Sequence, residues 1–170
     1  MLLAYVLGKD RTWLLAHDVD AVPMRAAARF RSLMRQRSTH VPVAYLVGEQ
    51  EFYGRPFFVD ARVLVPRPKT ELLVEAALQH IPQRGKYTVA DIGTGSGNIA
   101  VTIACERPRT RVFATDISLR ALRVARKNAS RHKVATHMTL LHGNLLAPLV
   151  GKHCDMLLAN LPYLPAHRKL

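Results

Sequence analysis

The sequence has few cysteines and no grouping of residues that bind metals. Its two cysteines in 170 residues, Cys105 and Cys154, lie far apart and form no C-x-x-C pair. A disulfide framework and a zinc site are therefore not expected, and we predict two buried free thiols. The eight histidines are scattered and form no H-x-x-x-H pair. We predict no metal site.

The sequence also lacks a long uncharged hydrophobic run. A membrane-spanning helix needs roughly 20 consecutive apolar residues, whereas Lys9, Asp10 and Arg11 interrupt the N-terminal run MLLAYVLG. The same charges interrupt the run before it could serve as the hydrophobic region of a signal peptide. We expect a cytoplasmic protein that does not bind membranes.

Acidic residues are scarce. Twelve Asp and Glu stand against 25 Lys and Arg, which gives a formal net charge of +13. A positive field speeds encounter with RNA or with ribosome-associated partners. Many of the cations fall on two expected helical faces, 25–37 and 120–133, and a solvated outer surface is the simpler interpretation of both.

The order of apolar and turn-forming residues divides the chain into three parts. Residues 1–42 carry apolar side chains at helical spacing and predict a small helical subdomain. Residues 43–66 are β-branched and aromatic, split by Gly48 and Gly54, and predict a linking β-hairpin. Residues 67–170 are expected to form the main α/β domain. Hydrophobic residues make up 49% of the whole chain, which is enough to bury one core.

The main domain alternates between strand and helix patterns. Thr70 is placed to cap a helix that continues to Leu78. Short apolar runs and helical repeats then follow one another as strand 87–92, helix 99–105, strand 111–115, helix 118–132, strand 136–141 and strand 155–159. This order predicts an α/β fold with a doubly wound parallel sheet, which binds ligands at the carboxyl ends of its strands.

A glycine-rich turn connects the first of these strands to its helix. It has the sequence D-I-G-T-G-S-G, whose candidate binding residues are Asp91, Gly93, Thr94, Gly95, Ser96 and Gly97. Alternate glycines allow positive φ and a close approach of the backbone to a ligand. The spacing differs from G-x-G-x-x-G, and no lysine follows to form a phosphate loop. A simple chain reversal is the alternative interpretation.

Asp116 ends the second strand, beside the expected position of the glycine turn. A carboxylate there can accept hydrogen bonds from both ribose hydroxyls of a nucleoside. The alternative role is to cap the following helix, although Ser118 is available for that. Asp116 therefore favours a nucleoside-containing ligand.

The segment Asn160-Leu161-Pro162-Tyr163 directly follows the fourth strand, which neighbours the first in such sheets. The Asn160 side-chain oxygen and the Leu161 carbonyl can accept the two N–H hydrogens of an amide or exocyclic amine, and so turn its lone pair toward a methyl donor. Pro162 would fix the turn and Tyr163 would supply a wall for a flat group. An ordinary turn is the alternative.

Taken together, these motifs resemble the HemK/PrmC family of protein-(glutamine N5) methyltransferases. The matching segments are F-Y-G at 52–54, V-P-R-P at 65–68 with T-E at 70–71, D-I-G-T-G-S-G-N-I-A at 91–100, T-D-I-S at 115–118 and N-x-P-Y at 160–163. The resemblance runs in order from the first residue to Pro165. The P-R-P segment favours the release-factor enzymes over those that methylate ribosomal proteins.

The resemblance implies a class I, Rossmann-like sheet that uses S-adenosyl-L-methionine to methylate the glutamine in the Gly-Gly-Gln loop of peptide chain release factors. It implies that Gly93–Gly97 and Asp116 bind the cofactor, that Asn144 and Leu145 lie near the adenine, and that 160–163 hold the glutamine. It also implies that the N-terminal helices dock the release factor.

Two positions depart from the family, and the chain ends early. Asn144 replaces an aspartate, which keeps a hydrogen-bonding side chain but drops its charge, and Leu161 replaces a proline whose backbone carbonyl is the atom required. Family members begin earlier and continue through three more strands, so we expect a chain truncated at both ends. N-L-P-Y is also similar to rRNA adenine dimethyltransferases. A nucleic-acid adenine N6-methyltransferase and a catalytically silent fragment that binds the cofactor remain alternatives.

Overall fold

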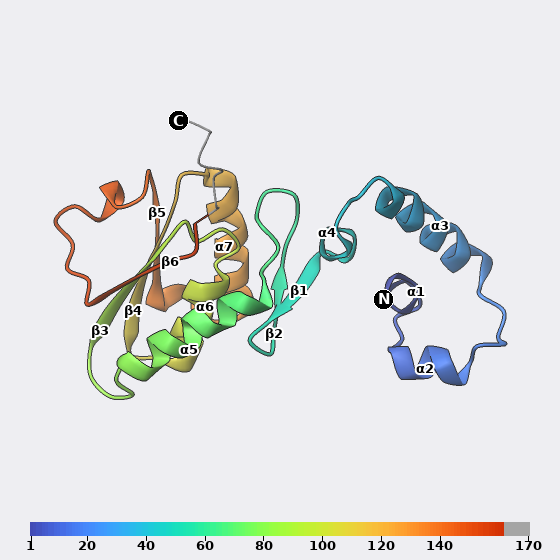
Figure 1. The fold of residues 1–170 in the computed structure, drawn as a ribbon, viewed down its shortest axis with the longest axis horizontal. Coiled ribbons are helices and arrows are strands. Elements are labelled where there is room, and N and C mark those ends of the chain that lie inside the picture. Colours follow the sequence, from blue (N-terminus) through green and yellow to red (C-terminus); the bar gives the residue numbers. More distant parts are fainter. Residues whose placement is uncertain (162–170) are drawn as a thin grey trace. The chain divides into compact units, whose positions relative to one another are not determined.

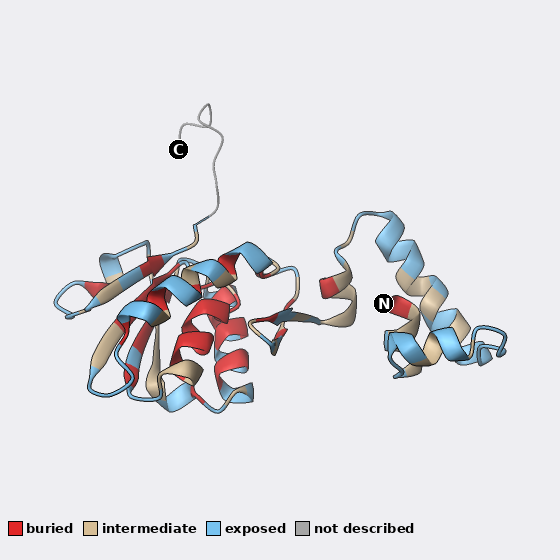
Figure 2. Ribbon diagram, turned by 60° about the horizontal axis from the view of Figure 1, so that its bottom comes forward, coloured by how far each residue is buried: buried red, intermediate tan, exposed pale blue. Residues whose placement is uncertain are grey.

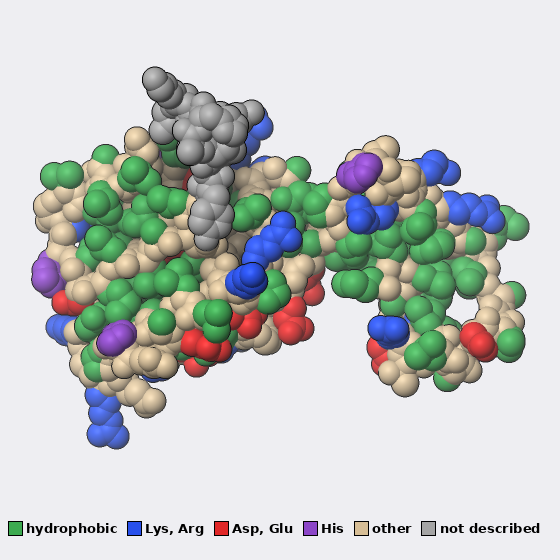
Figure 3. Space-filling model, viewed as in Figure 1, with side chains coloured by type: hydrophobic (Ala, Val, Ile, Leu, Met, Phe, Trp, Pro, Cys, Tyr) green, Lys and Arg blue, Asp and Glu red, His purple; other side chains and the backbone are tan. Residues whose placement is uncertain are grey.

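The computed structural model describes residues 1–161 as two compact units (Figure 1). The first unit comprises Met1–Glu49, and the second begins at Gln50. Each is described by itself. Among residues 1–161, no helix is long and apolar enough to span a bilayer. Lys and Arg side chains are visible on the surfaces of both units (Figure 3).

The first unit is helical. Its helices are α1 (Leu2–Leu7), α2 (Arg11–Ala16), α3 (Met24–Ser38) and α4 (Val43–Val47). The carboxylate of Asp10 accepts a hydrogen bond from the Trp13 backbone N–H at 2.6 Å and so caps α2. Helices α1, α3 and α4 contact one another, and Leu2 and Ala44 are buried there.

The segment 43–47 was expected to begin a strand, and that prediction is wrong. It forms α4, because Pro42 precedes it with φ −58° and Gly48 ends it in the left-handed region at φ 75°. The strands of the hairpin are instead β1 (Glu49–Phe52) and β2 (Arg55–Phe58). Tyr53 and Gly54 between them both have positive φ, as the common two-residue hairpin turn requires.

The second unit is built on a four-stranded parallel sheet in the order β5-β4-β3-β6. The strands are β3 (Tyr87–Ile92), β4 (Thr110–Asp116), β5 (Met138–His142) and β6 (Met156–Ala159). The expected parallel α/β fold is confirmed. The third strand begins two residues later than expected, because Ala135–His137 form a 3-10 turn, η2.

Helices α5 (Glu71–His80), α6 (Asn98–Glu106) and α7 (Leu119–Arg131) share one hydrophobic core with the sheet. Helix α6 is almost wholly buried, whereas α5 and α7 bury one side only. Figure 2 shows the buried residues gathered between the sheet and its helices. On the opposite face, Ala90, Ile92 and Phe113 pack with Leu149 of the 3-10 turn η3 (Ala147–Leu149).

The two cysteines differ from the expectation in burial. Cys105 and Cys154 are free, as expected, but both are partly exposed rather than buried. Cys105 follows the buried run of α6 at its C-terminal end, and Cys154 lies in the loop before β6. These positions at the margins of the packed layers explain the difference.

Candidate functional site

The glycine turn after β3 is shaped by its backbone. Gly93, Gly95 and Gly97 have φ of 70°, 55° and 79°, values that residues with a Cβ rarely adopt. A Cβ added at Gly97 would lie 3.1 Å from the Cβ of Ala125 on α7. At Gly95 an added Cβ would meet no side chain. The turn is therefore packed closely against α7 on one side and open at its middle glycine.

Asp91 at the end of β3 is buried beneath this turn. Its Oδ2 accepts hydrogen bonds from Thr94 Oγ1 at 2.6 Å and from the Ala100 N–H at 3.3 Å. Its Oδ1 is buried without a hydrogen-bond partner in the described structure. Burial raises the pKa of Asp91 to about 6, the two hydrogen bonds oppose this, and the charge of Asp116 adds to it. An unpartnered buried carboxylate oxygen fits a site that receives a cationic ligand group.

Asp116 joins the ends of β3 and β4. Its Oδ2 accepts a hydrogen bond from the Gly95 N–H at 2.9 Å, and its Oδ1 accepts one from the Ser118 N–H at 2.8 Å. Ser118 itself caps α7, since its Oγ accepts from the Ala121 N–H. The structure thus places Asp116 beside the glycine turn, and each oxygen keeps acceptor capacity for a ligand hydroxyl.

The loop after β5 reaches the same edge of the sheet. Asp116 pairs in register with His142, and the Gly143 N–H donates to the Asp116 carbonyl at 3.1 Å. Thr115 Oγ1 donates to the carbonyl of Leu145, which has φ 44°. Asn144 is exposed. Both loop residues predicted from the sequence, Asn144 and Leu145, therefore lie near the end of β4.

Ile117 is a neighbour that the sequence prediction missed. It directly follows Asp116, and its carbonyl accepts a hydrogen bond from Nε2 of His142 at 2.9 Å. Its side chain is 69% exposed, although it stands at the binding edge of the sheet. An exposed isoleucine beside a carboxylate can cover one face of a flat ring. The signal available in the sequence was an apolar residue directly after the strand-ending acid.

Asn160 lies on the other side of the glycine turn. Ala159 pairs with Ile92, so the residues after β6 run beside the residues after β3. A Cβ added at Gly93 would lie 2.7 Å from Cδ2 of Leu161. The partly buried Asn160 donates from Nδ2 to Thr70 Oγ1 at 3.0 Å. Pro162 and Tyr163, the other two predicted residues of this segment, lie outside the described residues.

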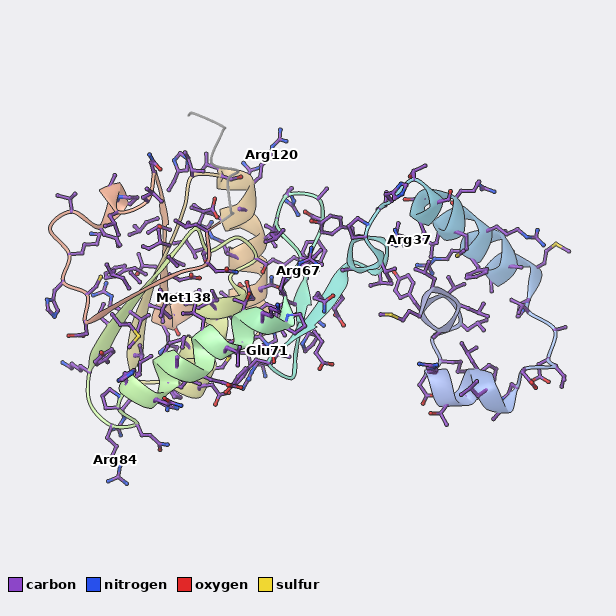
Figure 4. All side chains as sticks on the ribbon, viewed as in Figure 1. Arg37, Arg67, Glu71, Arg84, Arg120 and Met138 are labelled. Atoms are coloured by element: carbon purple, nitrogen blue, oxygen red, sulfur yellow. The ribbon has the colours of Figure 1, made fainter. Side chains whose placement is uncertain are left out.

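Segment 64–70 closes this part of the site. A pocket is lined by residues from three places: Leu64–Arg67 with Thr70, the turn Gly93–Ser96 with Asn98 and Ile99, and Asn160. Glu71 begins α5, and Arg67 precedes the 3-10 turn that leads into this helix; both are labelled in Figure 4. Thr70 was expected to cap α5, but it makes no capping hydrogen bond, because its backbone is already helical (φ −73°, ψ −17°) and not extended as at an N-cap. Its hydroxyl accepts a hydrogen bond from Asn160.

A fully buried asparagine holds the walls of the site together. Asn128 on α7 accepts a hydrogen bond from the Phe58 N–H and donates to the Phe58 carbonyl, at 2.8 and 3.0 Å. Its Nδ2 also donates to the carbonyl of Ser96 at 2.8 Å. One amide therefore ties the hairpin and the glycine turn to α7. The sequence prediction missed this residue, because nothing in its local pattern separates it from an exposed helical asparagine.

A larger hollow of about 390 Å³ lies elsewhere on the sheet, lined by Thr88, Arg111, Phe113, Thr139, Lys152 and His153. Arg111 and Thr88 pair near the amino ends of their strands. This hollow contains none of the predicted site residues. Parallel sheets bind their ligands at the carboxyl ends of the strands, so the candidate site is the edge that holds Asp116 and Asn160.

Two family models match the chain. Residues 69–169 match the family described as Methyltransferase small domain, and residues 1–48 match the PrmC N-terminal domain. The first match spans more than half of the chain. The chain belongs to the Methyltransferase small domain family. This match contains the glycine turn, Asp116 and Asn160.

Two curated relatives of this methyltransferase domain carry the same name. Proteins named release factor glutamine methyltransferase from Xylella fastidiosa strain Temecula1 and from Moorella thermoacetica are 44% and 45% identical to the chain, over 96% and 97% of it. The chain spans 59% and 58% of the length of these relatives. Together with the family matches, they confirm the resemblance to the HemK/PrmC methyltransferases.

Solved structures share the fold at low sequence identity. The "delta-N METTL16 MTase domain" aligns with a TM-score of 0.54 and 18% identity, over 62% of this chain and 51% of that one. A precorrin-8w decarboxylase from Methanobacterium thermoautotrophicum aligns with a TM-score of 0.50 and 24% identity, over 61% and 54%. The class I methyltransferase fold expected from the sequence is confirmed.

The family match supports S-adenosyl-L-methionine as the cofactor of this methyltransferase domain, and the residues fit it. The unpartnered Oδ1 of Asp91 suits a cationic group, and the open middle of the glycine turn leaves room where a Cβ would intrude. The carboxylate of Asp116 suits ribose hydroxyls. Within residues 1–161, no group of three or more His, Cys, Asp or Glu is placed to hold a metal ion.

Proposed function

We propose that the chain transfers a methyl group from S-adenosyl-L-methionine to the side-chain amide nitrogen of a protein glutamine, the one in the Gly-Gly-Gln loop of a peptide chain release factor. The observation that carries the proposal is the position of Asn160. It stands at the carboxyl end of β6, beside the glycine turn, with its Nδ2 bound to Thr70. Its Oδ1 is therefore the amide atom available to a target N–H.

Chemistry at an amide nitrogen needs such a group. The nitrogen lone pair is delocalised into the carbonyl, so it must be held in line with the methyl group. Two acceptors, Oδ1 of Asn160 and the carbonyl of Leu161, would take the two N–H hydrogens and fix that geometry. When bound, S-adenosyl-L-methionine supplies an electrophilic methyl group on a cationic sulfur. No strong base is required for the attack, because the proton leaves after the nitrogen has become cationic.

The remaining site residues would hold the cofactor. Asp116 would accept the ribose hydroxyls, and the turn Gly93–Gly97, with Thr94 and Ser96, would let the backbone approach it closely. Asp91 would face a cationic group with its free oxygen. Asn144 and Leu145 would lie near the adenine, as their position beside the end of β4 supports.

The release factor as substrate is supported by the names of the relatives and by the match of residues 1–48 to the PrmC N-terminal domain. This first unit would dock the release factor. The chain has 25 Lys and Arg residues and twelve Asp and Glu residues. This excess of positive charge would favour association near the ribosome, whose RNA is a polyanion.

The test is transfer of a labelled methyl group. The chain is incubated with labelled S-adenosyl-L-methionine and, in separate reactions, with a release factor or with ribosomal RNA. Label that is lost on protease treatment of the release factor supports the proposal. Label that resists protease and disappears with ribonuclease would instead support an adenine N6-methyltransferase. Cofactor binding without transfer to either would indicate a silent binding protein.

A further inference from the structure

The contact between Thr70 and Asn160 is unusual for a threonine at the start of a helix. A threonine at the N-cap normally accepts a hydrogen bond from a backbone N–H in the first turn. Thr70 makes no such bond, and its Oγ1 accepts from Asn160 Nδ2 at 3.0 Å instead. Thr70 is only 7% exposed, so water is not readily available to its hydroxyl. The hydroxyl serves the candidate site rather than the helix.

The hydroxyl of Thr70 is held on a rigid corner. The backbone N–H of Thr70 donates to the Arg67 carbonyl at 2.9 Å. This bond closes the 3-10 turn η1 (Pro68–Thr70), where the ring of Pro68 restricts the backbone. The next residue, Glu71, accepts a hydrogen bond from the Tyr53 N–H of the hairpin turn at 2.9 Å. The corner is therefore fixed on both sides of Thr70.

A side-chain amide has a donor end and an acceptor end that occupy similar space. If Nδ2 of Asn160 faces Thr70, then Oδ1 faces away from it and can accept from a target N–H. If the amide were turned over, Nδ2 would meet the N–H hydrogens of the target, and neither would find an acceptor. A hydroxyl can accept from Nδ2 or donate to Oδ1, and in the structure Thr70 Oγ1 accepts from Nδ2 of Asn160, which is the pairing that leaves Oδ1 for the target.

We propose that Thr70 is a positioning residue for methyl transfer, and that its Oγ1 orients the Asn160 amide so that Oδ1 faces the target nitrogen. This proposal rests on the proposed role of Asn160. The proposal gives a function to Thr70, the threonine of the P-R-P-x-T-E segment. The sequence alone predicted only that this residue caps a helix. Thr70 acts through Asn160, and no contact with substrate is required of it.

The test compares Thr70→Val, which keeps the shape and removes the hydroxyl, with Thr70→Ser, which keeps the hydroxyl. Loss of one neutral hydrogen bond that acts in the transition state should lower kcat for methylation of a release factor about tenfold in Thr70→Val. Thr70→Ser should keep kcat within about twofold of the parent. The KM for the release factor, the Kd for S-adenosylhomocysteine and the melting temperature should change little in both.

A double variant separates positioning from support of the fold. Once Asn160→Ala has removed the amide, Thr70→Val should cause no further loss of kcat. Unchanged kcat in Thr70→Val alongside a strong loss in Asn160→Ala would overturn the role of Thr70 and leave the proposed function standing. Additive losses would likewise overturn it. Full activity of Asn160→Ala would overturn the proposed role of Asn160 itself.

Discussion

The carboxylate of Asp116 accepts a hydrogen bond from the backbone N–H of Gly95 at 2.9 Å. These residues are 21 positions apart in the chain and belong to the ends of neighbouring strands. The contact fixes the middle of the glycine turn against β4 and holds the acidic group at the same edge. The residue proposed to bind the ribose therefore also shapes the turn that would receive the rest of the cofactor.

Asp116→Ala should weaken the binding of S-adenosylhomocysteine by about 2–4 kcal/mol, because two charge-assisted hydrogen bonds to the ribose would be lost. Titration calorimetry measures this directly. Asp10→Ala is the matched control, since it removes the same charge from the cap of α2 in the first unit. Equal affinity in the parent and in Asp116→Ala would remove Asp116 from the cofactor site.

Gly95→Ala should weaken cofactor binding far more than it weakens the fold. Gly95 has φ 55°, and a Cβ there would point into open space. Gly151 has φ 75° and is equally open, so Gly151→Ala should cost similar stability, about 1 kcal/mol, without affecting binding. Thermal unfolding and calorimetry give the two quantities. If both variants bind the cofactor like the parent, the open side of the turn does not face the ligand.

Asp91→Asn should stabilise the protein without cofactor at pH 7 and weaken cofactor binding. Burial raises the pKa of Asp91 to about 6 from its usual 3.8. The folded protein therefore binds the proton more tightly than the unfolded chain, and stability falls as pH rises from about 4 to 6. Above that window the buried charge costs on the order of 2–3 kcal/mol, which the neutral amide avoids.

Denaturant unfolding at two pH values checks this prediction. At pH 7, Asp91→Asn should raise the free energy of unfolding, whereas below pH 4 the difference should disappear, because Asp91 is then protonated in both states. A variant that is destabilised equally at both pH values would contradict the assigned ionisation.

Asn128→Ala should lower the free energy of unfolding by about 3 kcal/mol, since it removes three hydrogen bonds and leaves the buried carbonyl of Ser96 and the part-buried backbone groups of Phe58 without these partners. The exposed Asn144 provides a control, because Asn144→Ala should change stability by less than about 0.5 kcal/mol. Denaturant unfolding measures both. Similar values for the two variants would show that the tie between hairpin, turn and α7 has little effect on stability.

Much of this arrangement could be predicted from the sequence, for a physical reason. Central parallel strands are apolar and end abruptly, so the predicted bounds of β3 and β4 agree closely with those in the structure. Ligands bind at the carboxyl ends of such strands, and this rule placed Asp116 beside Gly95. Helix α4 was missed because five residues are too few to display a helical period. In so short a segment, Pro42 and Gly48 decide the conformation.

The contacts that were missed are all tertiary. Thr70 and Asn160 are 90 residues apart in the chain, so no local sequence pattern contains both of them. Asn128 reaches Phe58 across 70 residues. Residue type and spacing identify a threonine that can cap a helix, but only the packed chain decides which donor its hydroxyl meets.

The most direct test of the proposed function is mass spectrometry of a release factor after incubation with S-adenosyl-L-methionine and either the parent chain or Asn160→Ala. The proposal predicts that the parent adds the mass of one methyl group to the glutamine of the Gly-Gly-Gln peptide, and that Asn160→Ala lowers the rate about 100-fold or more, while cofactor affinity is retained. Leu161→Pro should keep the activity, because it preserves the backbone carbonyl. Methylation at another residue, or full activity of Asn160→Ala together with loss of activity in Leu161→Pro, would contradict the proposal.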